Sequence, residues 1–287
     1  MKILIRGAGD IATGIALRLY RAGMQVVMTD LPAPTAIRRT VCFSQAIILG
    51  EMTVEDVTAR RAETPDQAEA LLAQGLIPVL ADPDCTCRTR LRPDALVDAI
   101  LAKRNLGTTM DDAPIVVGIG PGFTAGEDCH AVVETMRGHT LGRVIYRGSA
   151  LPNTNIPGLI GGYAGERVLR APADGIFCQK LEIGAVVRAG DVAGEVAGQP
   201  MRCTIDGVLR GILADGTPAF RGMKAGDVDP RCKPEYCTTA SDKALAVGGG
   251  VLEAVLHPPA GSGHQPHQKG GDEGALPHPI QGVGQDQ

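Results

Sequence analysis

The sequence predicts an α/β fold in which a Rossmann-like parallel sheet domain precedes a small all-β barrel-sandwich module. Three observations support this prediction. A strand, a glycine turn, a helix and a second strand follow one another within the first 30 residues. Short β segments separated by glycines occupy residues 166–214. Hydrophobic residues make up 44% of the 287-residue chain and aromatic residues only 3%, so an aliphatic core is expected, which suits α/β layers and compact barrels.

The N-terminal unit begins with an apolar strand over residues 2–6. It continues through the turn Gly7-Ala8-Gly9-Asp10-Ile11-Ala12 into an amphipathic stretch that ends before Gly23. A second strand is predicted over residues 25–29, and Asp30 follows it directly. The unit has the order that a nucleotide-binding β-α-β motif requires.

The following segment is expected to alternate strands and helices, which predicts a parallel sheet. The predicted elements are a helix over 67–74, a strand over 77–81, a strand rather than a helix over 95–101, a strand over 115–119, a helix over 132–136 and a strand over 143–146.

The second half of the chain differs in composition. After a first domain over residues 1–152, a Gly/Asn/Pro-rich linker is expected over 153–165, and then the β module with a closing helix over 166–256. Residues 257–287 are rich in Gly, Pro, His and Gln with almost no apolar pattern, which predicts a disordered tail.

Composition and charge disfavour several classes of protein. The net charge is −4 with no basic block, so a nucleic-acid partner is not expected. No apolar run approaches the roughly 20 residues that span a bilayer, and the N-terminus lacks a signal-peptide pattern, which predicts a cytoplasmic protein without membrane contact. None of the eight cysteines forms a C-x-x-C pair, so free thiols are expected and no metal site is predicted.

The first candidate site is the turn at Gly7, Gly9, Asp10 and Ala12. Gly7 would permit the tight turn, Gly9 the close approach of a diphosphate, and Ala12 the close packing of helix on sheet. Asp30 is placed to accept hydrogen bonds from a ribose diol. The alternative is a turn that no longer binds a nucleotide, and the carboxylate of Asp10 near the phosphates favours that alternative.

A second candidate is the glycine-rich loop at Gly118, Gly120 and Gly122, which follows a predicted strand. Its amides could form an anion nest close to the first turn. The alternative is that these glycines only let the chain turn.

Catalytic candidates are weaker. Cys85 and Cys87 follow a strand end and could carry sulfur or bind a soft metal, but an exposed turn with incidental cysteines is the favoured interpretation. His139 could supply acid–base chemistry, although an ordinary solvated helix face is favoured there.

The β module resembles biotinyl and lipoyl carrier domains in the segments 169–176 and 183–192. Those domains present a lysine on a tight hairpin, whereas the matching hairpin here reads Gln199-Pro200-Met201-Arg202. Covalent biotin or lipoate is therefore not expected.

Five segments together resemble one accessory family, and they lie at residues 5–14, 101–108, 120–123, 134–139 and 167–172. They are similar to the YqeB-like proteins of the selenium-dependent molybdenum hydroxylase system, from residue 3 to about residue 256. The resemblance implies an accessory or maturation role, with the hydroxylase or its maturation factors as partners and with a nucleotide-bearing ligand such as a molybdenum cofactor dinucleotide. It supplies no catalytic residues.

Two alternatives stay open. The glycine turn from Gly7 to Ala12 and Asp30, taken alone, are compatible with an NAD-dependent oxidoreductase. In such an enzyme the Asp30 carboxylate would select NAD over NADP. No proton donor can be assigned for that reaction. The other alternative is a non-catalytic scaffold, and whether the chain is an enzyme or a homo-oligomer is left open.

Overall fold

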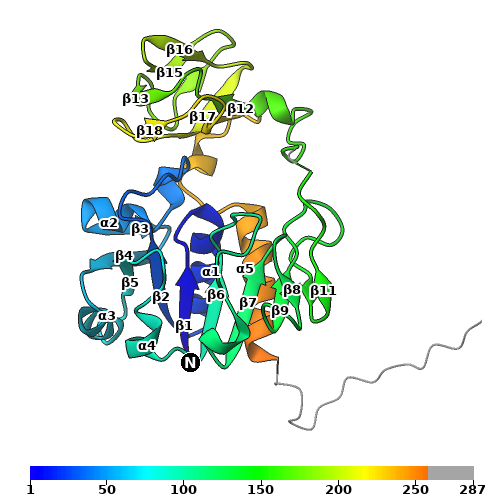
Figure 1. Ribbon diagram of the computed structural model, residues 1–287. Coiled ribbons are helices and arrows are strands. Elements are labelled where there is room, and N and C mark those ends of the chain that lie inside the picture. The colour runs from blue at the N-terminus through cyan, green and yellow to red at the C-terminus, as the bar shows by residue number, and fades with distance from the viewer. Residues whose placement is uncertain (155, 258–287) are drawn as a thin grey trace, which may run out of the picture. The chain divides into compact units, whose positions relative to one another are not determined.

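The computed structural model describes residues 1–154 and 156–257, and the sequence-predicted tail lies outside these residues apart from His257. A nine-stranded sheet forms the centre of the part containing both the N-terminus and the last helix (Figure 1). Its strands are β1 (Lys2–Arg6), β2 (Gln25–Asp30), β3 (Glu51–Val54), β4 (Val57–Ala62), β5 (Ile77–Ala81), β6 (Ala95–Asp98), β7 (Ile115–Ile119), β9 (Ala131–Val133) and β10 (Val144–Ile145). The strand order is β10-β9-β7-β6-β1-β2-β5-β4-β3.

Most neighbouring strands of this sheet are parallel. The exceptions are the two outermost pairs, β3–β4 and β9–β10, which are antiparallel. The helices of this part are α1 (Asp10–Arg21), α2 (Gln45–Leu49), α3 (Pro65–Leu72), α4 (Arg88–Leu91) and α5 (Asp242–Leu256). A short two-stranded ladder, β8 (Thr124–Ala125) with β11 (Gly148–Ser149), lies beside them.

The central strands of the sheet are buried on both faces, which explains why they read as nearly continuous apolar runs. Ile3 and Ile5 of β1 point to one face, where α1, α2 and α5 supply the partner side chains. Leu4 points to the other face, which is covered by α3, α4 and the segment from Phe123 to Cys129.

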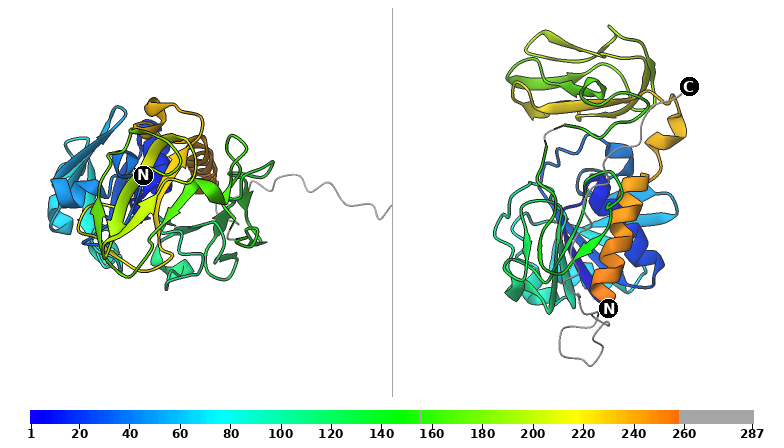
Figure 2. Two further views of the ribbon diagram at one scale, coloured as in Figure 1. Left: turned by 90° about the horizontal axis from the view of Figure 1, so that it is seen from above. Right: turned by 90° about the vertical axis from the view of Figure 1, so that its right-hand side faces the viewer.

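Helices α1 and α5 pack very closely on the first face (Figure 2). A Cβ atom at Gly14 would lie 2.4 Å from Ala244 Cβ, and one at Gly248 would lie 2.9 Å from the Gly14 carbonyl oxygen. Gly248 also faces Arg18, one turn further along α1. Contacts therefore advance in the same direction along both helices, so α1 and α5 run parallel and their N-termini lie at the same end.

The β module consists of two four-stranded antiparallel sheets, in the orders β12-β19-β17-β14 and β16-β15-β13-β18. The strands are β12 (Val168–Arg170), β13 (Gly175–Gln179), β14 (Val186–Val187), β15 (Val192–Val196), β16 (Gln199–Arg202), β17 (Gly207–Ile212), β18 (Pro218–Ala219) and β19 (Lys224–Asp229). Phe177 is fully buried in their shared core. The Ile212 amide donates to the Ile37 carbonyl over 2.8 Å, which joins the module to the segment after β2.

The predicted fold class, a Rossmann-like parallel sheet followed by a biotinyl/lipoyl-like barrel-sandwich, is wrong. The structure is a mixed α/β fold with large sheets. The hairpin β3–β4 extends the main sheet with an antiparallel edge, where no strands are predicted from the sequence. Between β5 and β10 the only α-helix among the described residues is the four-residue α4, so the regular alternation of strands and helices is absent.

Individual elements agree better with expectation. The predicted strands at 2–6, 25–29, 77–81 and 115–119 are confirmed, and the strand predicted over 95–101 is confirmed as the shorter β6. The predicted helix over 132–136 is wrong, because Ala131–Val133 form β9 between β7 and β10. The closing helix is present as α5, but it packs on α1 rather than completing the β module.

Candidate functional site

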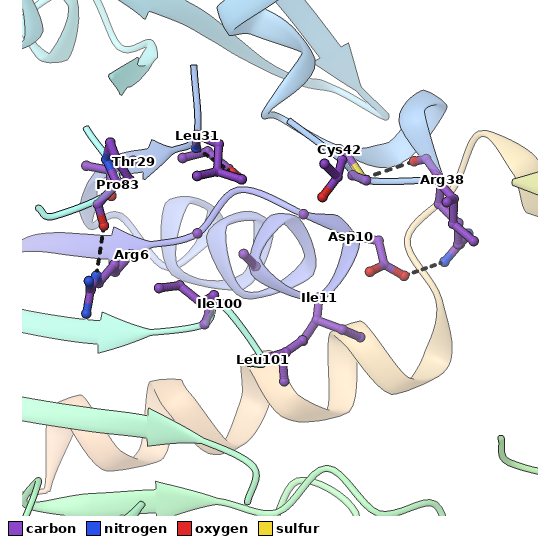
Figure 3. A pocket seen from close by; sticks show the side chains of 18 of the residues that line it. Arg6, Asp10, Ile11, Thr29, Leu31, Arg38, Cys42, Pro83, Ile100 and Leu101 are labelled. Carbon is purple, nitrogen blue, oxygen red and sulfur yellow. Dashed lines mark hydrogen bonds and ion pairs between the residues drawn. The ribbon is translucent and has the colours of Figure 1, made fainter. Parts of the chain in front are cut away.

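A cleft of about 520 Å³ lies at the carboxyl ends of β1, β2 and β6 (Figure 3). We call it the first cleft. It contains all of the candidates that the sequence predicted around the first turn, namely Gly7, Gly9, Asp10, Ala12 and Asp30. Its walls also include Leu31, Ile37, Ile100, Leu101 and Leu106, which give it an apolar side.

Gly7 is required by the fold itself. Its φ is +104°, and a Cβ there would lie 2.9 Å from the backbone carbonyl carbon of Ala99. Its amide donates to the Thr29 carbonyl over 2.8 Å, which continues the contact between β1 and β2 into the turn. Gly7 therefore shapes the turn and leaves its amide unavailable to a ligand.

Gly9 differs, because a Cβ there would have no atom within 4 Å apart from those of Gly9 itself and its two chain neighbours. It is the N-cap of α1 and has no side chain to cap the helix. Within the described ranges, no group accepts a hydrogen bond from the amides of Gly9, Asp10, Ile11 or Ala12. The helix thus presents four donors and the positive end of its dipole at the first cleft.

Asp30 lies beside this helix N-terminus. One carboxylate oxygen accepts a hydrogen bond from the Ala8 amide and the other accepts one from the Leu31 amide, both over 2.7 Å. Burial raises the pKa of Asp30, and the two amide donors oppose that rise. Each oxygen keeps a lone pair, so the carboxylate can accept further hydrogen bonds from a diol.

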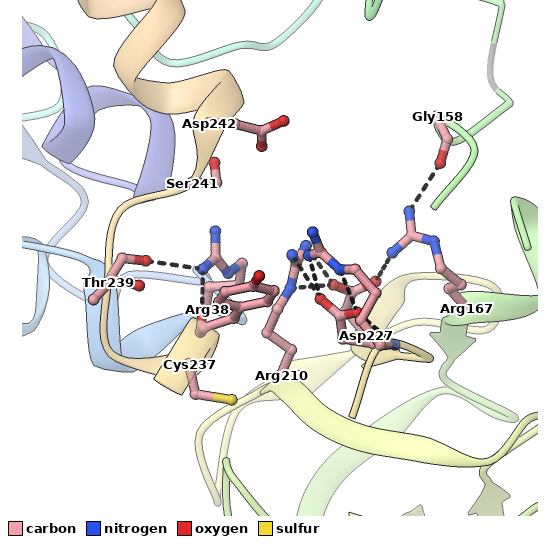
Figure 4. Close-up of polar contacts among 12 residues, drawn as sticks. Arg38, Gly158, Arg167, Arg210, Asp227, Cys237, Thr239, Ser241 and Asp242 are labelled. Atoms are coloured by element: carbon pink, nitrogen blue, oxygen red, sulfur yellow. Dashed lines mark hydrogen bonds and ion pairs between the residues drawn. The ribbon is translucent and has the colours of Figure 1, made fainter. Parts of the chain in front are cut away.

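Asp10 does not stand alone at the helix N-terminus. Its carboxylate is paired with the Arg38 guanidinium over 3.2 Å. Arg38 is only 6% exposed and also donates to the carbonyl oxygens of Tyr236 and Thr239, in the segment before α5 (Figure 4). Arg38 therefore partly neutralises Asp10 and ties the first cleft to the chain leading into α5.

A larger cavity of about 920 Å³ adjoins the first cleft, and we call it the second cavity. The two share the lining residues Asp10, Ile11, Arg38, Leu101 and Lys224. Eight basic residues line the second cavity: Arg38, Lys103, Arg137, Arg167, Arg170, Arg210, Lys224 and Lys243. Asp10 is the sole acidic residue in its described lining.

Most of the arginines there are held by carboxylates. Arg137 makes a two-pronged contact with Asp242 over 2.7 and 2.8 Å. Arg167 and Arg210 share Asp227, each over less than 3 Å (Figure 4). These pairs fix the guanidinium groups at the rim between the β module and α5.

The glycine-rich loop lies elsewhere than predicted relative to the first cleft. None of its glycines is among the described residues that line that cleft, whereas Ile119 and Pro121 line the second cavity. A Cβ at Gly118 would lie 2.4 Å from the Phe123 ring, and one at Gly120 would lie 2.7 Å from the Thr135 hydroxyl. For Gly122 the obstacle is the Arg104 backbone at 2.6 Å. Packing accounts for Gly118, and packing together with a positive φ accounts for Gly120 and Gly122.

The candidate thiols are buried in the core and line neither cavity. Cys85 and Cys87 are 2% and 5% exposed, on the face covered by α4. A hydrogen bond between the two thiols lowers the pKa of Cys85 and raises that of Cys87 far above its usual range. His139 is exposed and is not among the described residues that line either cavity. No ligand contact follows from these positions.

Sequence reasoning missed the cationic residues Arg38, Lys224 and Lys243. They lie far apart in the sequence: Arg38 is in a segment without clear periodicity, Lys224 begins β19, and Lys243 is in the first turn of α5. Only tertiary structure brings them together, so no local motif could have identified them. Across the described ranges no group of His, Cys, Asp and Glu is arranged to hold a metal ion, and no helix is long and apolar enough to cross a membrane.

Similarity to solved structures is low. A succinylglutamate desuccinylase/aspartoacylase from Rhodobacter sphaeroides is 25% identical over 22% of each chain, with a TM-score of 0.20. An aspartoacylase family protein from Mesorhizobium loti is 13% identical over 52% of this chain and 60% of that chain, with a TM-score of 0.22. Scores this low carry no argument about fold or activity.

The sequence comparison is more informative. No protein-family model matches the chain. An uncharacterized protein YqeB of Escherichia coli (strain K12) is 52% identical over 254 residues, which cover 88% of this chain and 47% of the relative. The chain is therefore YqeB-like over most of its length, and it spans about half the length of that relative.

Proposed function

We propose that the first cleft binds a nucleotide-bearing ligand, with its phosphates at the N-terminus of α1 and a ribose diol on Asp30. The observation that carries the proposal is that one cleft contains four unpartnered amides, from Gly9 to Ala12, and the half-buried carboxylate of Asp30. Amides and a helix dipole are the groups that proteins use to bind phosphate without a metal.

The remaining features of the cleft fit the same ligand. The space that a Cβ at Gly9 would fill is open, which lets a phosphate approach the backbone. Arg38 offsets the charge of Asp10, the carboxylate in the first turn of α1. The apolar wall suits a purine or pterin ring, and the volume of about 520 Å³ lies within the range of small-molecule sites.

The biological role that we propose is an accessory one, in the maturation of a selenium-dependent molybdenum hydroxylase. Its support is the resemblance to YqeB-like proteins stated above, together with a site suited to a dinucleotide such as that of the molybdenum cofactor. On this proposal the hydroxylase or one of its maturation factors is the partner that receives the ligand.

Two measurements test the proposal. Native mass spectrometry of the full chain, purified anaerobically from its own host, should reveal a pterin dinucleotide retained in the protein. Bound NAD would instead favour an oxidoreductase, and an empty protein that also fails to bind added nucleotides would favour a scaffold.

The second measurement is calorimetric titration with ADP. Gly9→Val should abolish ADP binding, because its side chain fills the phosphate space. Asp30→Asn should weaken it about tenfold, since a hydrogen bond to a charged group contributes about 1.5–3 kcal/mol. Lys180→Met, on a surface lysine paired with Glu195, is the matched control and should bind like the parent chain. Unchanged binding in Gly9→Val would contradict the assignment.

A further inference from the structure

The second cavity carries an excess of positive charge that its own side chains do not balance. Its described lining contains eight basic residues and one acidic residue. We propose that this cavity binds a phosphate-type oxyanion, held by the ammonium groups of Lys224 and Lys243. The site is separate from the amides of the first cleft and does not depend on the function proposed for them.

Among the described residues, four basic side chains of the cavity are held by no carboxylate. They are Lys224, Lys243, Lys103, and Arg170, which donates to the Gly222 carbonyl. Arg38, Arg137, Arg167 and Arg210 are each paired with a carboxylate. By contrast, no carboxylate or other acceptor in residues 1–154 and 156–257 contacts the ammonium group of Lys224 or of Lys243. A cation lining a cavity without a counter-ion is a ready partner for an anionic ligand.

Lys243 occupies an unfavourable place for a cation. It lies in the first turn of α5, where the helix dipole is positive, two residues after the N-cap Ser241. The Arg137 guanidinium and Lys224 add to the repulsion, and burial together with these charges lowers the pKa of the Lys243 amine. Asp10 and Glu134 act in the opposite direction without pairing with it. A bound anion would offset this accumulated charge.

The direction of the two long helices strengthens the case. Since α1 and α5 run parallel, their positive ends lie together, and Asp10 and Ser241 at those ends both line the second cavity. The Ser241 hydroxyl oxygen accepts from the Ala244 amide over 3.2 Å, which leaves its hydrogen able to donate to an anion. The N-terminal ends of both helices, the two lysines and Ser241 therefore line one cavity.

Such an oxyanion has two possible sources: a free phosphate compound, or a phosphate of a ligand that extends from the first cleft. Because the cavities share five lining residues, one molecule can reach both. The test separates these sources by using inorganic pyrophosphate and ADP as probes on the full chain.

Calorimetric titration with pyrophosphate should show binding to the parent chain and to Gly9→Val, in which the first cleft is blocked. Lys224→Met and Lys243→Met should each raise the Kd at least about tenfold, whereas Lys180→Met should leave it unchanged. If pyrophosphate does not bind but the two cavity variants weaken ADP by the same factor, the oxyanion is part of the first ligand. If the cavity variants change neither titration, the inference is overturned.

A second measurement keeps the test decisive even if the variants fold poorly. Competitive acetylation of the parent chain, read for each lysine by mass spectrometry, should show Lys243 protected by saturating pyrophosphate and Lys180 unprotected. Equal acetylation of Lys243 with and without pyrophosphate would contradict the site. If ADP fails to bind while pyrophosphate still protects Lys243, the proposed function fails and the oxyanion site stands.

Discussion

The three consecutive glycines in α5 give a direct test of how closely it packs. Gly249 is exposed, and a Cβ there would meet no atom within 4 Å. Gly250 is buried, and a Cβ there would lie 2.2 Å from the Gly142 carbonyl oxygen and 2.8 Å from the Val133 side chain. Gly249 and Gly250 therefore have the same intrinsic helix propensity, but one faces open space and the other faces packed protein atoms.

Alanine substitution separates these two effects. Replacing glycine by alanine in a helix stabilises it by about 1 kcal/mol at either position. At Gly250 this gain is opposed by overpacking of about 1–3 kcal/mol, at the upper end because the obstacle is backbone. We expect Gly249→Ala to be more stable than the parent chain by up to about 1 kcal/mol, and Gly250→Ala to be less stable by about 2 kcal/mol.

Urea and thermal unfolding, followed by circular dichroism, measure the difference. About 3 kcal/mol between the two variants corresponds to roughly 6–12 °C in Tm for a domain of this size. Equal melting temperatures for Gly249→Ala and Gly250→Ala would refute the close contact of α5 with Gly142. The position of Lys243 depends on the same helix, so the test also bears on the second cavity.

Three further predictions concern charge and thiols. The Arg137 guanidinium lowers the pKa of Asp242, so the stabilising contribution of Asp242 should be present above about pH 4 and lost below it. In urea unfolding, Asp242→Asn should be less stable than the parent chain at pH 7 by under about 1 kcal/mol. A stability difference that does not shrink at lower pH would contradict this. Burial lowers the pKa of Lys243 in the folded chain, so the folded state disfavours its charged form below about pH 10.5. Lys243→Met should therefore unfold at a higher urea concentration than the parent chain at pH 7, and this difference should fade as the pH rises toward 10.5. In labelling with a thiol reagent, exposed Cys178 and Cys232 should react quickly in the native chain, whereas Cys85 and Cys87 should react only on unfolding; rapid native labelling of Cys85 would restore it as a candidate for sulfur transfer.

The elements predictable from the sequence are those formed by contiguous residues. β1, α1 and β2 follow from local periodicity and the Gly7 turn, because each is completed before residue 31. The prediction of a helix over 132–136 is wrong because Val132 and Val133 fit a helical pattern and a strand pattern equally well. Their pairing with β7, which is a tertiary contact, makes this segment a strand. The hairpin β3–β4 was not predicted, because apolar and polar residues alternate only weakly along its two strands.

The candidate site was predictable to the extent that it depends on the first turn. Gly9 and Asp30 do lie in one cleft, which follows from the β-α-β unit alone. The second cavity depends on the return of α5 from the far end of the chain, and that return is encoded by Gly14 and Gly248 at the contact. Glycine has a low helix propensity, so these two residues argue against a helix when the sequence is considered alone. The partner helix that explains them is visible only in the structure.

Asp10 connects the two cavities and bears on whether the first turn has lost its ligand. A lone carboxylate at a helix N-terminus would occupy the place of a phosphate and repel it. Here the Arg38 guanidinium holds that carboxylate, and both groups line the first cleft and the second cavity. The pair therefore contributes no net charge between two regions that each favour an anion. Arg38 also donates to the carbonyls of Tyr236 and Thr239. The chain leading into α5 therefore holds the guanidinium that offsets the charge of Asp10 and leaves the phosphate site open to an anion.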